Sequence, residues 1–577
     1  VLAPLEMPPG FHYPDVPQVN YVDREVFAKL RRLNITPSDL CSDNEFLRRV
    51  MIDTVGSLPS ARDVRDFVAD KRPDKQARKI DELLADPRHA SLWATKFCDI
   101  TGDNTDLLEN PQQRRAKLSQ MWHDWFEKRL AENMPYDQIV RGVLCATSRD
   151  KLSPEDYLKQ YKELEADADK GWTNTYAEKP TLDLFWRRQQ NVTVDVWGEK
   201  TAAAFLGVRV ECAQCHKHPF DRWTQTDYRA YANIFTAVSF GISPTAKQVF
   251  DAENADRKAQ NDKDKKNLLQ PVREIFIGQA ATGKRGNGGA LPNPDTGRPL
   301  APKALGGPEI EVKDGEDPRE VLFQWMDAPN NPFFARAFVN RVWGHYFGVG
   351  IVDPVDNFSL ANPPSNPKLL DALAQDFIAN RYDLRKLERT ILNSHTYQLS
   401  SSVNATNKLD RINYSHSYLR PMMAEVMVDV LDDAVGVKEK FGNDGPPDCR
   451  AIDIGASRVQ GSEALAFRVF GRPVRASTCD CDRSSDPALT QTLFLMADDQ
   501  LYARINQQDN RLKQILAEHK DDNEALDEMF LGALARVPTE KERAKFASYR
   551  ESHKDRRAAF GDALWALVNT REFRLNH

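Results

Sequence analysis

The sequence predicts a mainly α, multi-helix, two-domain protein with a small irregular or β insertion between its halves. Two observations lead to this fold class. Apolar residues recur at three- and four-residue spacing over most of the chain, which is the period of an amphipathic helix. The 577 residues also exceed what one hydrophobic core organises, because single cores stop growing near about 250–300 residues.

The first half reads as a series of helices. Segments 23–30 and 77–84 place their apolar side chains on one helical face, and turn residues separate such segments from one another. The stretch 148–179 is polar and charged, so we interpret it as a connecting excursion. Residues 1–250 are therefore predicted to form an N-terminal helical domain.

Two helices are expected to enclose a cysteine motif near the end of this first domain. Residues 199–208 are rich in alanine and predict a helix that leads into the motif. Thr224 and Asp227 then have the spacing of a capping box, which marks the start of the next helix. The motif is thus expected in a tight connection between two helices.

The insertion is expected at residues 251–307. A charge run begins near Asp256, and a stretch rich in Gly, Pro and Asn follows it and ends at Pro308. The short apolar segment 272–277 inside this polar stretch indicates a small strand pair. The helical periodicity resumes at Pro318, so residues 308–577 are predicted to form a C-terminal helical domain.

Composition excludes several classes of protein. Apolar residues make up 41% of the chain and charged residues 28%, as in ordinary globular proteins. The 79 basic and 85 acidic residues are interspersed and give a net charge of −6, so nucleic acid is not an expected partner. No apolar run has the length of a membrane-spanning helix, and no transmembrane segment is predicted.

The motif that carries chemistry is Cys212-Ala-Gln-Cys215-His216. Two thiols at this spacing can add to the two vinyl groups of one haem, and the adjacent His can reach the iron as an axial ligand. We therefore predict covalently attached haem c. The alternatives are a redox-active or structural cysteine pair and half of a zinc site, although no second ligand pair follows nearby to complete the zinc site.

The residues after the motif also suit the edge of a cofactor. His218 is expected to bond a haem propionate, to orient His216 or to help bind substrate, unless it is an ordinary solvated loop residue. Trp223 is expected to pack on the macrocycle, with a place in the protein core as the alternative.

A second group of candidates lies in the C-terminal half. His345 is a candidate distal iron ligand or general base, and a packed core residue is the alternative. Asp353 and Asp356 could act as an acid–base pair or bind a cation, although aspartates in such turns commonly cap the backbone. We count all three residues, together with His218, as candidate catalytic groups.

Cys479-Asp-Cys481 is the other close cysteine pair. Neighbouring cysteines with one residue between them rarely pair with each other, so each needs a metal, another partner or a buried place. We consider a second metal ion at Cys479 and Cys481, a place at the haem edge, and a disulfide to Cys449. Glu425 is a further acid–base candidate, and Met422 or Met423 could be a thioether iron ligand.

Several long segments of the sequence resemble a known protein family. Residues 205–228, together with 46–50, 56–59 and 183–188, resemble the cytochrome-c-like domain of large secreted planctomycete proteins. The second half resembles the domain of unknown function that usually follows it, through residues 331–348, 352–358, 394–400 and 470–484. The resemblance implies an extracytoplasmic location, whether periplasmic, cell-surface or secreted, and haem c, in bacteria that degrade complex polysaccharides. It implies no particular reaction.

Three functions follow as hypotheses. The first is a secreted c-type haem oxidoreductase or electron-transfer protein linked to sugar or polysaccharide breakdown, which needs an electron-transfer partner. The second is a carbohydrate-active hydrolase or lyase that uses the C-terminal acid–base residues, with haem as an accessory. The third is a cell-surface binding or scaffold protein. For the first two, we expect the polar stretch 345–357 or the segment around Cys479 to line the same cleft as the motif.

Overall fold

The computed structural model describes residues 4–109, 112–188, 192–265, 268–278, 289–311, 316–459, 463–476, 478, 483 and 489–577. These residues form 25 α-helices and two small two-stranded sheets, which confirms the predicted mainly α fold class. The helices of the first half are α1 (Tyr21–Leu33), α2 (Asp43–Val55), α3 (Ala61–Ala69), α4 (Lys75–Ala85), α5 (Pro87–Thr101), α6 (Arg115–Ala131), α7 (Tyr136–Leu144), α8 (Pro154–Lys170), α9 (Val194–Thr201), α10 (Gln225–Ala232) and α11 (Lys247–Lys263).

The second half is built in the same way. Its helices are α12 (Pro318–Asp327), α13 (Phe334–Phe347), α14 (Pro367–Ala379), α15 (Leu384–Leu392), α16 (His395–Gln398), α17 (Ala424–Val435), α18 (Glu463–Val469), α19 (Leu489–Ala497), α20 (Asp499–Ile505), α21 (Arg511–Glu518), α22 (Asp522–Leu534), α23 (Glu540–Ser552), α24 (Arg556–Val568) and α25 (Arg571–Arg574). Many begin at a side-chain cap, as α23 does at Thr539, where Glu542 completes a capping box.

The sheets are small, and only one of them touches the predicted insertion. Strand β1 (Val238–Gly241) pairs antiparallel with β2 (Glu274–Ile277), and Val238 lies opposite Ile277. A strand, β2, is therefore present where the short apolar segment 272–277 indicated one. Its partner, β1, precedes the predicted insertion. The other sheet pairs β3 (Arg420–Pro421) with β4 (Leu575–Asn576).

The charged stretches around these strands are helices, so the interpretation of 148–179 as a mere connection is wrong. Helix α8 occupies much of it and buries Tyr157 against Phe250 of α11, with 5.8 Å between the ring centroids. Arg257 of α11 pairs with Glu165 of α8 at 2.7 Å. The two helices are polar on most of their surface because they share only this narrow apolar contact.

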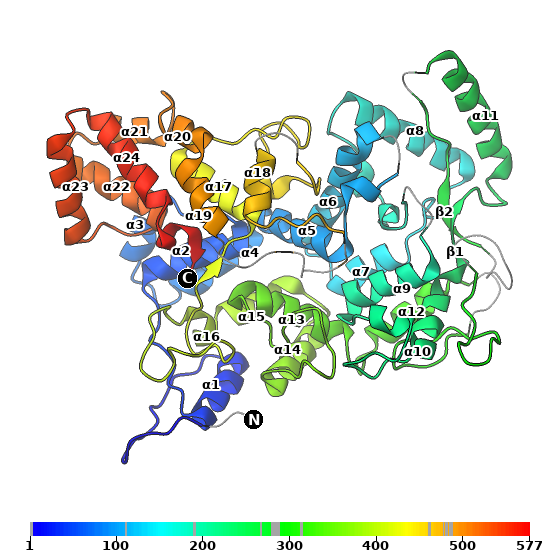
Figure 1. Cartoon of the computed structure of the whole chain (residues 1–577), viewed down its shortest axis with the longest axis horizontal. Coiled ribbons are helices and arrows are strands. Elements are labelled where there is room, and N and C mark those ends of the chain that lie inside the picture. The colour runs from blue at the N-terminus through cyan, green and yellow to red at the C-terminus, as the bar shows by residue number, and fades with distance from the viewer. Residues whose placement is uncertain are drawn as a thin grey trace.

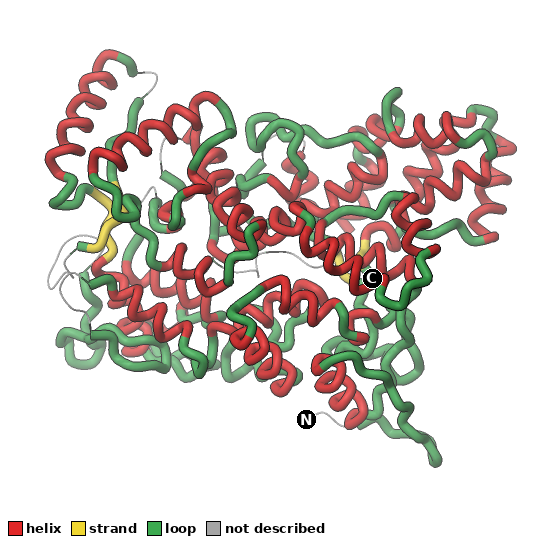
Figure 2. Tube along the Cα trace, turned by 180° about the vertical axis from the view of Figure 1, so that it is seen from behind, coloured by secondary structure: helices red, strands yellow, loops and turns green. Residues whose placement is uncertain are grey.

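The beginning and the end of the chain pack together. Helices α2 and α3 lie beside α21–α24 and the C-terminus in Figure 1, and the view from behind in Figure 2 shows the same arrangement. The buried Arg48 of α2 donates to the carbonyl oxygen of Phe573 at 2.9 Å, and Arg49 donates to that of His577 at 2.7 Å. One hydrophobic core contains residues from both ends, such as Val22 and Phe573.

The core thus joins residues of the predicted N-terminal and C-terminal domains. Trp93 of α5 packs against Phe338 of α13 at 6.1 Å between ring centroids, and its indole nitrogen donates to Glu388 of α15 at 2.6 Å. None of the helices described is both long and apolar enough to cross a membrane.

Candidate functional site

The chain changes its winding just before the cysteine motif. Helix α9 ends at Thr201 and continues as a π-helical turn, Ala202–Leu206, which closes at Gly207 with a φ of 63°. The alanine-rich stretch is therefore helical as expected, but its last turn is π rather than α. Such turns are rare and occur frequently at functional sites.

The C-terminal half holds this turn in place. Arg341 of α13 is 1% exposed and donates to the carbonyl oxygens of Ala203 at 2.8 Å and Ala204 at 2.6 Å. The amide of Phe358 donates to the carbonyl oxygen of Gly207 at 2.8 Å. A Cβ atom at Gly207 would lie 3.0 Å from the Phe358 ring, so the close approach requires glycine. The position of the motif therefore depends on both halves of the chain.

The motif itself is exposed. Residues Glu211–Gln214 form a single 3-10 turn, and Cys212, Cys215 and His216 all face solvent, with both thiols free. Nδ1 of His216 lies 2.7 Å from the carbonyl oxygen of Lys217, which fits an Nδ1–H donor and leaves Nε2 with a lone pair. A neutral imidazole with its other nitrogen held in this way is the usual form of a metal-binding His.

Helix α10 begins where the sequence predicts. The Thr224 hydroxyl accepts from the Asp227 amide at 3.1 Å, and the Asp227 carboxylate accepts from the Thr224 amide at 3.0 Å. The predicted capping box is confirmed, and the motif does lie between two helices.

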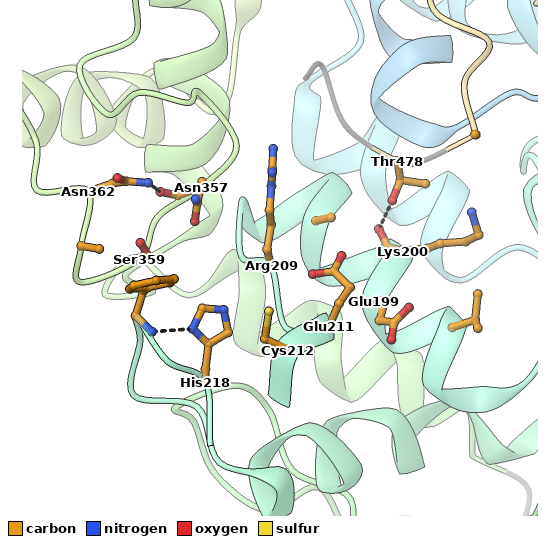
Figure 3. Close-up of a pocket in the computed structure, with 15 residues that line it drawn as sticks. Glu199, Lys200, Arg209, Glu211, Cys212, His218, Asn357, Ser359, Asn362 and Thr478 are labelled. Carbon is orange, nitrogen blue, oxygen red and sulfur yellow. Dashed lines mark hydrogen bonds between the residues drawn. The ribbon is translucent and has the colours of Figure 1, made fainter. Parts of the chain in front are cut away.

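A cavity of about 730 Å³ opens beside Cys212 (Figure 3). Most of its lining side chains are charged or polar, and they come from α9, the motif turn, the loop after α13 and the segment near residue 478. The side chains labelled in Figure 3 are Glu199, Lys200, Arg209, Glu211, Cys212, His218, Asn357, Ser359, Asn362 and Thr478. Asn357 confirms the expectation that the stretch 345–357 reaches the cleft of the motif.

Two cations line this cavity. Burial lowers the pKa of Lys200 to about 8, helped by the nearby charge of Arg188, and no described carboxylate forms an ion pair with this ammonium group. Arg209 pairs with the buried Asp356 at 2.6 Å. Lys200 and Arg209 thus offer positive charge beside an exposed thiol.

The same cavity carries two carboxylates that sequence reasoning missed. Glu199 accepts a hydrogen bond from the Tyr228 hydroxyl at 2.6 Å, and burial raises the pKa of Glu199 even though this hydrogen bond acts in the opposite direction. Figure 3 shows Glu211 near Glu199. The only signal in the sequence was their closeness to the cysteine motif.

His218 and Trp223 have different positions. His218 lines the cavity, and its Nδ1 accepts from the amide of Phe220 at 3.2 Å. Trp223 is 2% exposed, packs against Phe333 with 6.1 Å between ring centroids, and does not line the cavity. Trp223 thus takes the alternative place that the sequence allowed, in the core between the two halves.

His345 lies at another site, away from the motif residues. Its Nε2 is 2.8 Å from the carbonyl oxygen of Asp53, and it lines a second cavity of about 540 Å³ that lacks the motif residues. Met422 and Met423 line this second cavity as well. The reason is that the last turn of α13, where His345 lies, packs against α2.

Asp353 and Asp356 do not form an acid–base pair. Asp353 is exposed, whereas Asp356 is fully buried and paired with Arg209. Asn340 orders the intervening loop, since its amide donates to the carbonyl oxygens of Val352 at 2.8 Å and Val355 at 2.9 Å. The polar residues of this stretch therefore shape a loop, and Asp356 reaches the cavity only through Arg209.

The carboxylate of Glu425 is part of a buried ion-pair network. Glu425 is fully buried, and its carboxylate pairs with Arg483 at 2.7 Å and Arg472 at 3.1 Å. Burial alone would raise the pKa of Glu425, but the two guanidinium groups outweigh it and lower the pKa to about 2. Such a group does not hold a proton at neutral pH and does not serve as a general acid.

Cys479 and Cys481 lie outside the described residues. Of the described residues on either side of them, Thr478 lines the motif cavity and Arg483 lines the second cavity. The described residues do contain one group suited to a metal ion, His123, Asp124 and Glu127 of α6, whose ligand atoms lie within 4.8 Å of one another. No cysteine belongs to it.

Fold and cavity together define a class: a helical protein whose two halves jointly build a pocket around an exposed Cys-x-x-Cys-His motif. Residues 21–240 match the family model PSCyt2, described as a protein of unknown function (DUF1549). Residues 318–550 match the model PSD1, also described as a protein of unknown function (DUF1553). The chain thus carries these two domains in tandem. No curated protein and no solved structure matches it.

Proposed function

We propose that the chain is an extracytoplasmic c-type haem protein that works in oxidation–reduction, as an electron carrier or an oxidoreductase linked to sugar or polysaccharide breakdown. The observation that carries the proposal is the motif: two free, exposed thiols and a His whose Nδ1 is already engaged, next to a cavity of about 730 Å³. The resemblance to the cytochrome-c-like domain of secreted planctomycete proteins supports the same assignment.

The residues of the motif fit the group. Cys212 and Cys215 would form the thioether bonds, and Nε2 of His216 would bind the iron. Lys200 and Arg209 would pair with the propionates, since both line the cavity as cations. The imidazole of His218 lines the cavity wall and would donate or accept a hydrogen bond at the edge of the haem. When bound, haem supplies one-electron chemistry.

Location and partner follow from the same chemistry. Thioether formation needs reduced thiols and haem delivered outside the cytoplasm, so the proposal includes export. Because the motif faces solvent, a redox partner could approach it directly, and Phe220, which is 68% exposed at the cavity rim, offers an apolar contact for that partner.

The test is the state of the exported protein. Produced with an export signal and a cytochrome c maturation system, the chain is expected to gain the mass of one haem and to give the pyridine haemochrome spectrum of a c-type centre. The same chain kept in the cytoplasm should remain without covalent haem. An unmodified mass after export with an active maturation system would reject the proposal.

A second candidate function is acid–base catalysis on a carbohydrate. It is favoured by Glu199, whose pKa is raised by burial, in the same cavity as Glu211. A protonated and an ionised carboxyl group are what glycoside cleavage requires. Asn357, Ser359 and Asn362 would provide hydrogen bonds to sugar hydroxyls. This version places the acid–base residues in the N-terminal half rather than at Asp353 and Asp356.

Glu199→Gln tests this candidate. If Glu199 donates the proton, the release of reducing ends from a panel of oligosaccharides should fall about 100-fold or more, because general acid catalysis contributes that much. Glu163→Gln on the exposed face of α8 is the matched control and should retain full activity. If the wild-type chain releases no reducing ends from the panel, or if Glu199→Gln retains the wild-type rate, the hydrolytic function is excluded.

A further inference from the structure

The second cavity is a separate concave site on the molecule. It has a volume of about 540 Å³, within the range of about 300–1,000 Å³ typical of small-molecule sites. Its wall combines the end of α13, residues of α2, the loop that precedes β3, and the C-terminal segment near Asn576. None of the motif residues lines it, so it does not belong to the proposed haem site.

The lining of this cavity is strongly cationic. Six Lys or Arg side chains face a single carboxylate, that of Asp53, in a chain whose net charge is −6. Asp53 is already paired with Arg420, and Arg483 is paired with Asp99 and Glu425. These internal pairs leave the cavity with an excess of positive charge.

Three of the other cations are available to a ligand. Lys408, Arg411 and Arg571 are exposed at the cavity wall, and none forms an ion pair with a described residue. Two of them carry guanidinium groups, which bind carboxylate, sulfate and phosphate through paired hydrogen bonds. Lys96 is a buried cation of the same wall, with its ammonium group 5.7 Å from the centre of the Trp93 ring.

Two imidazoles add polar groups to the wall. His416 is 6% exposed, and its Nε2 is buried with no hydrogen-bond partner among the described residues, while Nδ1 is 3.1 Å from the carbonyl oxygen of Ser417. His345 donates through Nε2 to the carbonyl oxygen of Asp53, which leaves Nδ1 as an acceptor. A buried ring nitrogen without a partner costs free energy unless a ligand atom or a water molecule satisfies it.

The floor of the cavity is apolar. Leu92, Phe347, Met422 and Val426 contribute to it. A simple inorganic ion would use the cationic rim and leave this floor empty, whereas an anion attached to a larger uncharged body would use both.

We infer that this second cavity binds a small organic anion, whose carboxylate, sulfate or phosphate group is held by Arg411, Arg571 and Lys408. The body of the ligand lies over the apolar floor, within reach of the two imidazoles. The inference is independent of haem, because it uses none of the groups of the motif cavity.

Calorimetric titration of the full-length chain at low ionic strength tests this inference. The probes are sodium glucuronate, glucose 6-sulfate and glucose 6-phosphate, with glucose as the neutral comparison. At least one charged sugar is expected to bind with a Kd of about 1 mM or tighter, and glucose should not bind detectably. The tightest of the three identifies the anionic group that the cavity prefers.

Variants then place the binding in this cavity. Arg411→Gln together with Arg571→Gln should weaken the best probe at least tenfold, since both are exposed and carry no internal ion pair. Lys258→Gln with Lys541→Gln removes the same charge from the exposed faces of α11 and α23 and should leave the Kd unchanged. Lys408→Gln alone provides a separate check and should also weaken binding.

Binding that is equally weakened by the control pair would reflect only the overall charge of the chain and would overturn the inference. Failure of all three anions to bind, or a Kd unchanged in both the arginine pair and Lys408→Gln, would overturn it as well.

Discussion

Replacing both Cys212 and Cys215 by Ser is expected to abolish covalent haem attachment completely. A hydroxyl group does not add to the vinyl groups, and no other cysteine pair of the described residues has the required spacing to a His. Stability should change by less than about 1 kcal/mol, because both side chains are exposed and neither packs in the core. Intact mass and the visible spectrum of the exported protein measure the loss.

Cys41→Ser with Cys449→Ser is the matched control. Both of these thiols are free and half-buried, and neither lies near the motif in sequence, so haem attachment should be retained. His216→Ala separates attachment from iron ligation: thioether bonds should still form, but the spectrum of the iron should change. Retention of covalent haem in the double Cys212/Cys215 variant would show that the motif is not the attachment site.

The fold class could be predicted because helical periodicity is a local property. Thr224 and Asp227 illustrate this, since their spacing alone located the start of α10. Helix α8 was missed for a related reason. Its apolar positions, such as Tyr157 and Leu164, are few among charged residues, and the polarity of the stretch hid a helix that rests on a narrow contact with α11.

The motif could be predicted from the sequence, but its surroundings could not. Cys212 and His216 are recognisable by spacing alone. The loop containing Asn357 and the residue Thr478 reach the same cavity through long-range packing, which no local pattern records. Arg341, which holds the π-helical turn before the motif, gave no signal at all, because an Arg within an apolar helix looks like an exposed position.

None of His345, Asp356 and Trp223 lines the motif cavity, and the reason is the same for all three. A local density of polar or aromatic residues in the sequence suggests one shared cleft. Density in the sequence does not give side-chain direction, and here the last turn of α13 and the loop that follows it serve different cavities. The sequence suggested one site in the C-terminal half, whereas the structure places His345 and Asn357 in two separate cavities.

Glu425 holds two arginines, Arg472 and Arg483, and Arg483 also lines the second cavity. Both arginines pair with this carboxylate, and Arg483 also binds Asp99 of α5 at 2.6 Å. Since Glu425 lies on α17 and Asp99 lies in the first half, the ion network ties these arginines to both halves of the chain. Loss of this network should lower the free energy of unfolding of the whole chain.

Glu425→Gln is therefore expected to lower the free energy of unfolding at pH 7 by about 3 kcal/mol, because it leaves buried guanidinium groups without their counter-charge. The pKa of Glu425 falls from an ordinary 4.5 to about 2 on folding, so its contribution is fully present above pH 4.5 and is lost as the pH falls toward 2. The difference between wild type and variant should shrink to about half at pH 3.

Denaturant unfolding of both proteins at pH 7 and pH 3 measures this difference. Glu82→Gln is the matched control, since Glu82 pairs with Lys79 on the exposed surface of α4 and its side chain is 65% exposed. Loss of that pair should cost no more than about 0.5 kcal/mol at either pH. A Glu425→Gln difference that is as small as the control, or that grows as the pH falls, would mean that the carboxylate is not the charged centre of the network.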